Sequence, residues 1–240
     1  MKINWASIQN WILPVAALVA WEIFGHAGML PRYLSFPSAI LAALWELAIT
    51  GELFVALAAS LYRVSTGFVL GTVAGVIVGL GAGIVPGIRH FFDPLVSFLY
   101  SIPKIAIIAF SGFFPVFVAS RHAVLSVNKL LIWTAQNMGT PERKIFFRVI
   151  IPAAAPQLFS GVRIGLAHAF VVLFAAELIG SKVGLGTVIS SGEEWVRFDL
   201  MFAGIVCFAV LGFVSDRILL AVRARVLKGQ MIGTEEQGVR

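Results

Sequence analysis

The chain has 240 residues, of which 59% are hydrophobic and 12% charged, and its formal net charge is +6. Soluble domains carry about 25% charged residues, so this composition excludes a soluble fold and indicates an all-α protein solvated by membrane lipid. The basic residues stand in short stretches between apolar runs, as in cytoplasmic loops, which argues against nucleic acid as a partner. A single cysteine, Cys207, excludes an intrachain disulfide and a cysteine-based metal site.

Four segments are apolar over the roughly 20 residues that a membrane span needs, or nearly so. In chain order they are Trp11 to Leu30, Val64 to Val85, Ile164 to Ile179 and Leu200 to Ser215. Residues 36–62 differ, because Glu46 and Glu52 interrupt apolar residues at helical spacing. We expect this stretch to form one amphipathic helix at the outer surface, starting at the turn around Pro37.

Short loops rich in Lys and Arg mark the cytoplasmic side of a membrane protein. Segment 121–163 holds six basic residues and one acid, the tail from Asp216 holds five and three, and segment 181–199 holds two and three. We therefore expect the first two segments inside and 181–199 outside. Arg89 and His90 place the end of the Val64–Val85 span inside as well. The chain between residues 90 and 121 must then cross an even number of times, although residues 91–120 are too few for two full spans. Either a re-entrant or short hairpin lies there, or residues are missing.

Glycines recur at every fourth position of the Val64–Val85 span. They are Gly67, Gly71, Gly75, Gly79 and Gly83. A stripe of this kind removes side chains from one helix face and lets another helix approach closely. Both a sliding or dimer contact and static packing within one subunit are consistent with it.

The most informative segment lies between the second and third of these spans. A helix ends just before Gly139, and Thr140 and Pro141 then resemble the N-cap and first position of a basic helix. We expect Pro152 and Pro156 to break that helix before the next span. This helix–Gly–helix elbow is either an ordinary amphipathic loop or a rigid knob that protrudes from the membrane.

The elbow resembles the cytoplasmic loop signature of binding-protein-dependent ABC importer permeases: Glu-Ala-Ala, three residues, Gly, nine residues, Ile-x-Leu-Pro. The matching positions here are Trp133-Thr134-Ala135, Gly139, and Val149 with Ile151-Pro152. The runs SFPSAILAALWEL and AELIGSKVGLG are similar to the nitrate/sulfonate/taurine type of these permeases. There are two departures. Trp133 and Thr134 replace Glu and Ala, and about one short hairpin is missing where Ile105-Ala106-Ile107 joins two segments that the family keeps apart.

The resemblance implies a type I ABC importer permease with about five to six transmembrane helices in a bacterial inner membrane. It implies a cytoplasmic N-terminus over residues 1–10, a permease domain over 11–228, and a disordered cytoplasmic tail over 229–240. Its partners would be ABC ATPase subunits, a soluble substrate-binding protein and a second permease copy, as a homodimer. The solute would be small and anionic or sulfonated, such as nitrate, a sulfonate or taurine.

The chain lacks a GxxxxGK[ST] phosphate loop, so ATP would be bound and hydrolysed by the partner subunit, with no cofactor or catalytic residue here. Contact with that ATPase is expected from the elbow. The residues assigned to it are Ala135, Gly139, Glu142, Arg143, Lys144, Arg148 and Pro152. Glu177 is a candidate for the translocation path, because ionisable groups in spans are costly; it can equally snorkel to the interface or pair with Lys182.

Two other functions remain open at this point. A membrane-embedded enzyme would need clustered His, Asp or Glu within the membrane, and the four histidines are far apart in the sequence. An ion-coupled secondary transporter usually shows internal repeats and broken helices, and neither is evident.

Overall fold

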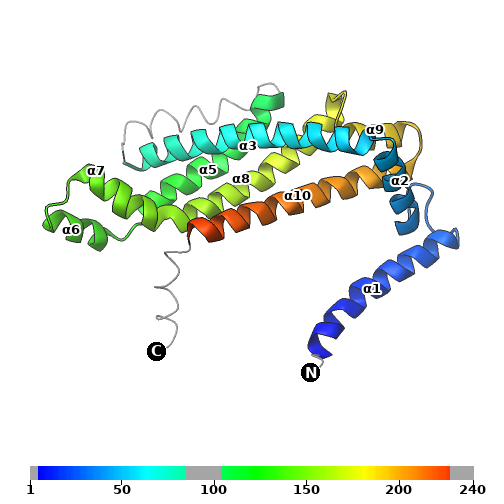
Figure 1. Ribbon diagram of the computed structural model, residues 1–240, viewed down its shortest axis with the longest axis horizontal. Helices are drawn as coiled ribbons and strands as arrows, with labels where there is room; N and C mark the ends of the chain where they lie inside the picture. The colour runs from blue at the N-terminus through cyan, green and yellow to red at the C-terminus, as the bar shows by residue number, and fades with distance from the viewer. Residues whose placement is uncertain (1–4, 85–103, 228–240) are drawn as a thin grey trace. The chain divides into compact units, whose positions relative to one another are not determined.

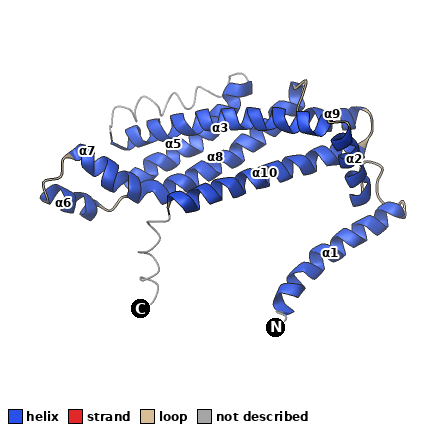
Figure 2. Ribbon diagram, viewed as in Figure 1, coloured by secondary structure: helices blue, strands red, loops and turns tan. Residues whose placement is uncertain are grey.

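The computed structural model describes residues 5–84 and 104–227, and Figure 2 shows helices joined by loops throughout that part, with no strand. The helices, labelled in Figure 1, are α1 Trp5–His26, α2 Pro37–Ile49, α3 Glu52–Ile84, α5 Lys104–Leu125, α6 Lys129–Asn137, α7 Glu142–Ile145, the π-helical turn η2 Phe146–Ile150, α8 Ile151–Gly180, α9 Leu185–Glu194 and α10 Phe198–Val226. The prediction of an all-α protein is confirmed.

Four of the described helices are long and apolar enough to cross a membrane. They are α3, α5 from Ile108 on, the unbroken run Glu142–Gly180, and α10. With the apolar α1, this number agrees broadly with the expected five to six. The expected tail over 229–240 and residues 1–4 of the expected N-terminal segment lie outside the described residues, while residues 5–10 form the start of α1.

The boundaries near the second span differ from the sequence prediction. Residues 36–62 do not form one helix, because α2 ends at Ile49 and α3 begins at Glu52. Gly51 between them has a φ of +80°, a left-handed conformation that only glycine adopts readily. Helix α3, which contains residues 64–84 of the expected span, therefore begins twelve residues before Val64. Helix α2 is a separate short helix with Phe36 as its N-cap and Pro37 at its first position.

The expected break at Pro152 and Pro156 is also wrong, because both prolines lie inside α8. A proline ring clashes with the carbonyl four residues back, which for Pro152 belongs to Arg148. The turn widens at this point: the N–H of Ile151 bonds to the Phe146 carbonyl, five residues back. The π-helical turn thus absorbs the proline, and the helix continues from the elbow to Gly180.

The chain folds into two compact units, which are described separately. Unit 1 comprises residues 1–60 and 177–210, and unit 2 comprises residues 61–176 and 211–240. In unit 2, parts of α3, α5, α8 and α10 lie side by side (Figure 1). Unit 1 contains α1, α2, the start of α3, the end of α8, α9 and the first part of α10.

The glycine stripe of α3 faces α5 within the same chain. A Cβ added at Gly75 would lie 2.9 Å from the Phe113 carbonyl oxygen, and one at Gly79 would lie 2.7 Å from that of Phe117. Gly67 meets Ile108 and Gly83 meets Val124, so the contact covers the second half of α3 and most of α5. The two numberings rise together, which means that α3 and α5 run in the same direction.

This parallel arrangement bears on the crossings expected between residues 90 and 121. If α3 ends on the inner side, α5 ends there too, in agreement with the inside placement of residues 121–163. The rest of that connection, residues 85–103, lies outside the described residues.

Helix α8 packs antiparallel to α5 in unit 2, again through glycines. A Cβ at Gly165 would lie 2.9 Å from the Gly112 carbonyl oxygen, and Gly161 abuts Ala119. On its other side α8 is joined to α10 by a bidentate ion pair, since Arg163 Nε donates to Asp216 Oδ1 at 2.6 Å and Nη2 donates to Oδ2 at 3.0 Å. Two charges that would be costly in lipid are paired there.

In unit 1, α2 and α9 both pack on the start of α10. Ile40, Ala43 and Leu47 of α2 form a buried cluster with Ala203. Arg197, just before α10, donates to both carboxylate oxygens of Glu46 at 3.0 and 2.7 Å. This hydrogen bond from Arg197 lowers the pKa of Glu46 below its usual value; because the pair is exposed, we expect it to fix geometry more than stability.

The glycine contact predicts a sharp difference between two faces of α3. Gly79→Leu should lower the free energy of unfolding of the subunit by about 1–3 kcal/mol, the usual cost of overpacking. The facing atoms include the backbone of Phe117, which cannot move aside as a flexible side chain can. Ala74→Leu, at an exposed position of the same helix, is the matched control and should be neutral. The measurement is the fraction of purified subunit that stays monodisperse in detergent after heating. Equal heat sensitivity of the two variants would contradict the contact.

Candidate functional site

The elbow of unit 2 turns at Gly139 through a Schellman motif. Gly139 has a φ of +72°, and its N–H donates to the Gln136 carbonyl at 2.9 Å. The N–H of Thr140 donates to the Ala135 carbonyl at 3.1 Å. These two bonds satisfy carbonyls that the end of a helix otherwise leaves free. Two residues assigned from sequence, Ala135 and Gly139, therefore define the shape of the turn.

Each arm of the elbow begins at a defined N-cap residue, and sequence analysis predicted a cap only for the second arm. The side chain of Asn128 accepts from the Leu130 N–H at 2.9 Å and starts α6. Helix α7 begins one residue later than expected, because Pro141 is its N-cap rather than its first helical residue. Its ψ of 146° is extended, so the chain enters the helix only at Glu142.

The basic residues assigned to the elbow lie on its surface. Glu142, Arg143, Lys144 and Arg148 are all exposed, and Pro152 is half-buried. Ile145 between them is buried, at 3% exposure. The arrangement presents three cations and one carboxylate to solvent while one apolar residue anchors the short helix.

Sequence reasoning missed an apolar surface on the same elbow. Leu130 and Trp133, one helical turn apart on α6, are 63% and 57% exposed, and Met138 at the turn is 80% exposed. Residues at this spacing share a helix face. The sequence does contain a signal for this surface, because the apolar Trp133 stands where the family signature has a glutamate. That replacement alone does not show that neighbouring apolar side chains are exposed with it.

The base of the elbow rests on the ends of α5 and α8. Ala123, Val127 and Ala154 form a buried cluster there, with Ile132 and Ile150 packed against it. The Ser126 hydroxyl donates to the side-chain oxygen of Gln157 at 2.8 Å, which adds a polar link between α5 and α8. The elbow is thus attached to helices of the membrane-spanning bundle.

Glu177 lies in unit 1, near the end of α8, and is 2% exposed. The Ser60 hydroxyl lies 2.8 Å from both of its carboxylate oxygens, and the N–H of Gly186 donates to Oε2 at 3.0 Å. The partners in this cluster come from α3 and from the start of α9. Sequence analysis named Glu177 but not Ser60, which is 117 positions away.

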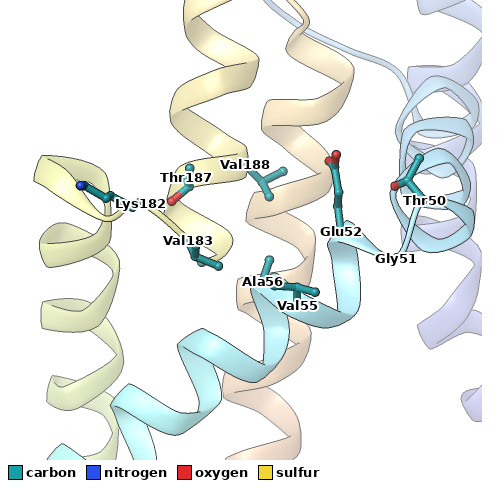
Figure 3. Close-up of a pocket in the computed structure, with 10 residues that line it drawn as sticks. Thr50, Gly51, Glu52, Val55, Ala56, Lys182, Val183, Thr187 and Val188 are labelled. Atoms are coloured by element: carbon teal, nitrogen blue, oxygen red, sulfur yellow. The ribbon is translucent and has the colours of Figure 1, made fainter.

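A pocket of about 370 Å³ opens beside this cluster in unit 1. Figure 3 shows Glu52 of α3 and Lys182 of the loop after α8 on opposite sides of it, with Val183 and Val188 between them. An acid and a base at the rim of an apolar hollow can hold a small polar group. Among the described residues, no group of three or more His, Cys, Asp or Glu comes together as metal ligands.

The sequence of the chain is similar to those of known membrane transport proteins. Residues 34–228 match the family described as the inner membrane component of binding-protein-dependent transport systems. The chain is 30% identical to the putative aliphatic sulfonates transport permease protein SsuC of Bacillus subtilis, over 92% of this chain and 87% of that protein. It is 33% identical to a probable ABC transporter permease protein of Brucella abortus, over 81% and 85%. It is 29% identical to the taurine transport system permease protein TauC of Escherichia coli, over 89% and 86%.

The family match covers the elbow, the glycine stripe and Glu177 together, and it brings with it a membrane-embedded role. The chain therefore belongs to the family of binding-protein-dependent transport system inner membrane components, the membrane-spanning, non-enzymatic subunits of ABC importers that depend on a separate ATPase and a separate binding protein.

Proposed function

We propose that this subunit forms the translocation path for a small solute that carries a sulfonate or a similar anionic group. The support comes from the relatives named above, two of which are named for aliphatic sulfonates and for taurine. A third, at 24% identity over 72% of this chain, is named as a bicarbonate transport permease. All three solutes are small and anionic or zwitterionic. They indicate the chemical class of the solute that this chain transports, but not which solute it is.

The observation that carries the mechanism is the preformed, exposed elbow. Its turn is closed by two backbone hydrogen bonds, its surface holds Arg143, Lys144 and Arg148, and its apolar residues Leu130 and Trp133 face solvent. Exposed aromatic and aliphatic side chains surrounded by charges are typical of a protein-docking surface. We propose that the ATPase subunit binds this surface. Its own contact surface would be a hydrophobic groove bordered by acidic residues, complementary to the apolar and basic side chains of the elbow.

Energy transfer then follows from helix continuity. Helices α7 and α8 form one run, Glu142–Gly180, which starts in the elbow and is apolar enough to cross the membrane. When two ATPase subunits close on ATP, they displace two such elbows and shift the helices attached to them. Two permease copies related by symmetry would thereby alternate between inward-facing and outward-facing arrangements, which is a rigid-body transition.

The proposed orientation places the elbow and the C-terminus in the cytoplasm. In unit 2, the end of α5, the elbow and the start of α8 meet around one buried cluster. The exposed basic residues Arg143, Lys144 and Arg148 are close to it in the chain. An excess of positive charge at one membrane side is typical of the cytoplasmic side. The loop that contains α9 would then lie outside.

Cysteine labelling tests this orientation. In a Cys207→Ala background, Lys144→Cys should not react with a membrane-impermeant maleimide in intact spheroplasts and should react after permeabilisation. Glu194→Cys, at the exposed end of α9, should react in both. Labelling of Lys144→Cys in intact spheroplasts would place the elbow outside, where no cytoplasmic ATPase reaches it.

Reconstituted transport tests the function itself. Proteoliposomes are prepared with the permease and its ATPase, and the binding protein and a labelled alkanesulfonate are added outside. They should take up the alkanesulfonate only when ATP is enclosed in the lumen, where it reaches the ATPase. Gly139→Pro should abolish ATPase co-purification, because proline cannot adopt a positive φ. Arg143→Glu should weaken co-purification by about tenfold, as expected for reversal of a charge at a docking surface.

The control for these variants is Arg32→Glu, the same charge reversal at an exposed position outside the elbow, which should leave ATPase binding unchanged. Uptake that survives ATP removal and collapses with an ion gradient would instead identify a secondary transporter. Full coupling in both elbow variants would exclude the elbow as the ATPase contact.

A further inference from the structure

The buried cluster around Glu177 contains the start of helix α9. The first residue of α9 is Leu185, whose N–H donates to the Ser60 hydroxyl oxygen at 3.0 Å. The second, Gly186, donates its N–H to the Glu177 carboxylate. The first N–H groups of a helix have no partner within the helix, and the residue at the N-cap position, Gly184, has no side chain to supply one. Two other helices therefore provide the cap of α9.

Glycine is required at two positions for this arrangement. Gly184 has a φ of +147°, outside the range that other residues adopt readily. A Cβ at Gly186 would lie 2.8 Å from the backbone carbonyl carbon of Glu177. The start of α9 thus sits directly against the backbone of α8, and a carboxylate at the positive end of a helix is electrostatically favourable. Ser60 and Glu177 supply the hydrogen-bond acceptors, and Gly184 and Gly186 allow the backbone to approach them.

The other face of α9 is fixed to α10. Ile189 is 4% exposed and lies against Gly204, while Gly192 packs on the backbone of Met201. Without its cap, α9 would keep this contact and its short connection to α8 through residues 181–184, but the hydrogen bonds that fix its first turn to α3 and α8 would be lost. The hydrogen bonds of Glu177 and Ser60 are therefore the buried polar link from α8 and α3 to the first turn of α9. A second, separate link is the Thr187 hydroxyl of α9, which donates to the carbonyl of Ser181, just after α8, at 3.1 Å.

Ser60 and Glu177 are also the residues at which α3 and α8 enter unit 1. Ser60 is the last residue of that unit on α3, and Glu177 is its first on α8. Glu177 stands at the far end of the helical run that begins in the elbow at Glu142. Any displacement of α8 that reaches its end arrives at the cap of α9.

Resting on the function proposed above, we infer that Glu177 is a positioning residue that locks α9 to the ends of α3 and α8, so that α9 follows α8 when the elbow is displaced. It holds the helix in place and does not bind the passing solute. A solute in contact with the carboxylate would have to replace hydrogen bonds that are already made, in a site where the side chain is 2% exposed.

The chemistry of the side chain separates locking from solute binding. Glu177→Gln keeps an oxygen that accepts from the Gly186 N–H and an amide that donates to the Ser60 oxygen, but it removes the negative charge. Glu177→Ala removes both contacts. If the residue locks α9, Glu177→Gln should retain uptake within about threefold of the wild type, while Glu177→Ala should lose about tenfold or more, the scale of a lost buried hydrogen-bond partner. Ser60→Ala should resemble Glu177→Ala.

The position of α9 is measured directly by spin-label distances in the purified permease. Labels at Ile179→Cys on α8 and Glu194→Cys on α9, both exposed, in a Cys207→Ala background, should give one narrow distance distribution in the wild type and in Glu177→Gln. The distribution should broaden in Glu177→Ala and in Ser60→Ala. Monodisperse behaviour in size-exclusion chromatography shows that a variant has folded.

The outcomes are distinct. A narrow distance distribution in Glu177→Ala overturns the inference. It is also overturned if Glu177→Gln transports as poorly as Glu177→Ala while its distance distribution stays narrow, because the negative charge would then be needed for transport of the solute and not for the position of α9. The distance measurement needs neither ATPase nor solute. If the reconstituted wild type fails to transport sulfonates, the proposed function fails, while the distances still decide the role of Glu177.

Discussion

The close approach of helices α3 and α5 is the constraint on which the rest of unit 2 depends. Helices surrounded by lipid gain no hydrophobic free energy from packing on one another, so they rely on many short dispersion contacts between small residues. Five glycines of α3 place its backbone against α5, and Gly161 and Gly165 of α8 do the same from the other side. Helix α5 is thus held between two others, and the elbow is built on its end.

The functional features lie along one continuous run of chain that starts in this bundle. The elbow turns at Gly139, the π-helical turn accommodates Pro152, and α8 then continues to Gly180. At one end of this run are exposed charges and a tryptophan, and near the other is a buried carboxylate bonded to the start of α9. One continuous helical run, Glu142–Gly180, therefore begins in the exposed elbow of unit 2 and ends in unit 1, three residues after the buried Glu177.

Hydropathy and local turn chemistry account for what could be predicted from the sequence. Uncharged stretches located α3, α8 and α10, and Gly139 located the elbow, because both signals are local. Helix α5 was not assigned as a span, because Lys104 and the short distance between residues 90 and 121 favoured a re-entrant or short hairpin. The break at Gly51 and the continuation through Pro152 were missed, since each depends on how a neighbouring turn adjusts. Helix α9 was not expected because its sequence, LGTVISSGEE, is rich in weak helix formers; it is stabilised by groups from other helices. The pairing of Ser60 with Glu177 joins residues too distant in the chain for any spacing rule to find, and the glycine stripe could not name α5 as its partner.

Under the proposed contact between the elbow and the ATPase, the turn at Gly139 has a consequence for how the importer assembles. Because the Schellman hydrogen bonds lie within the elbow itself, the knob holds its shape before any partner arrives. Little conformational entropy is then lost when it docks, which favours tight association from a modest contact area. A stiff knob also yields little under load, so a movement imposed on it is passed to the membrane helices instead of being dissipated in a deformable loop.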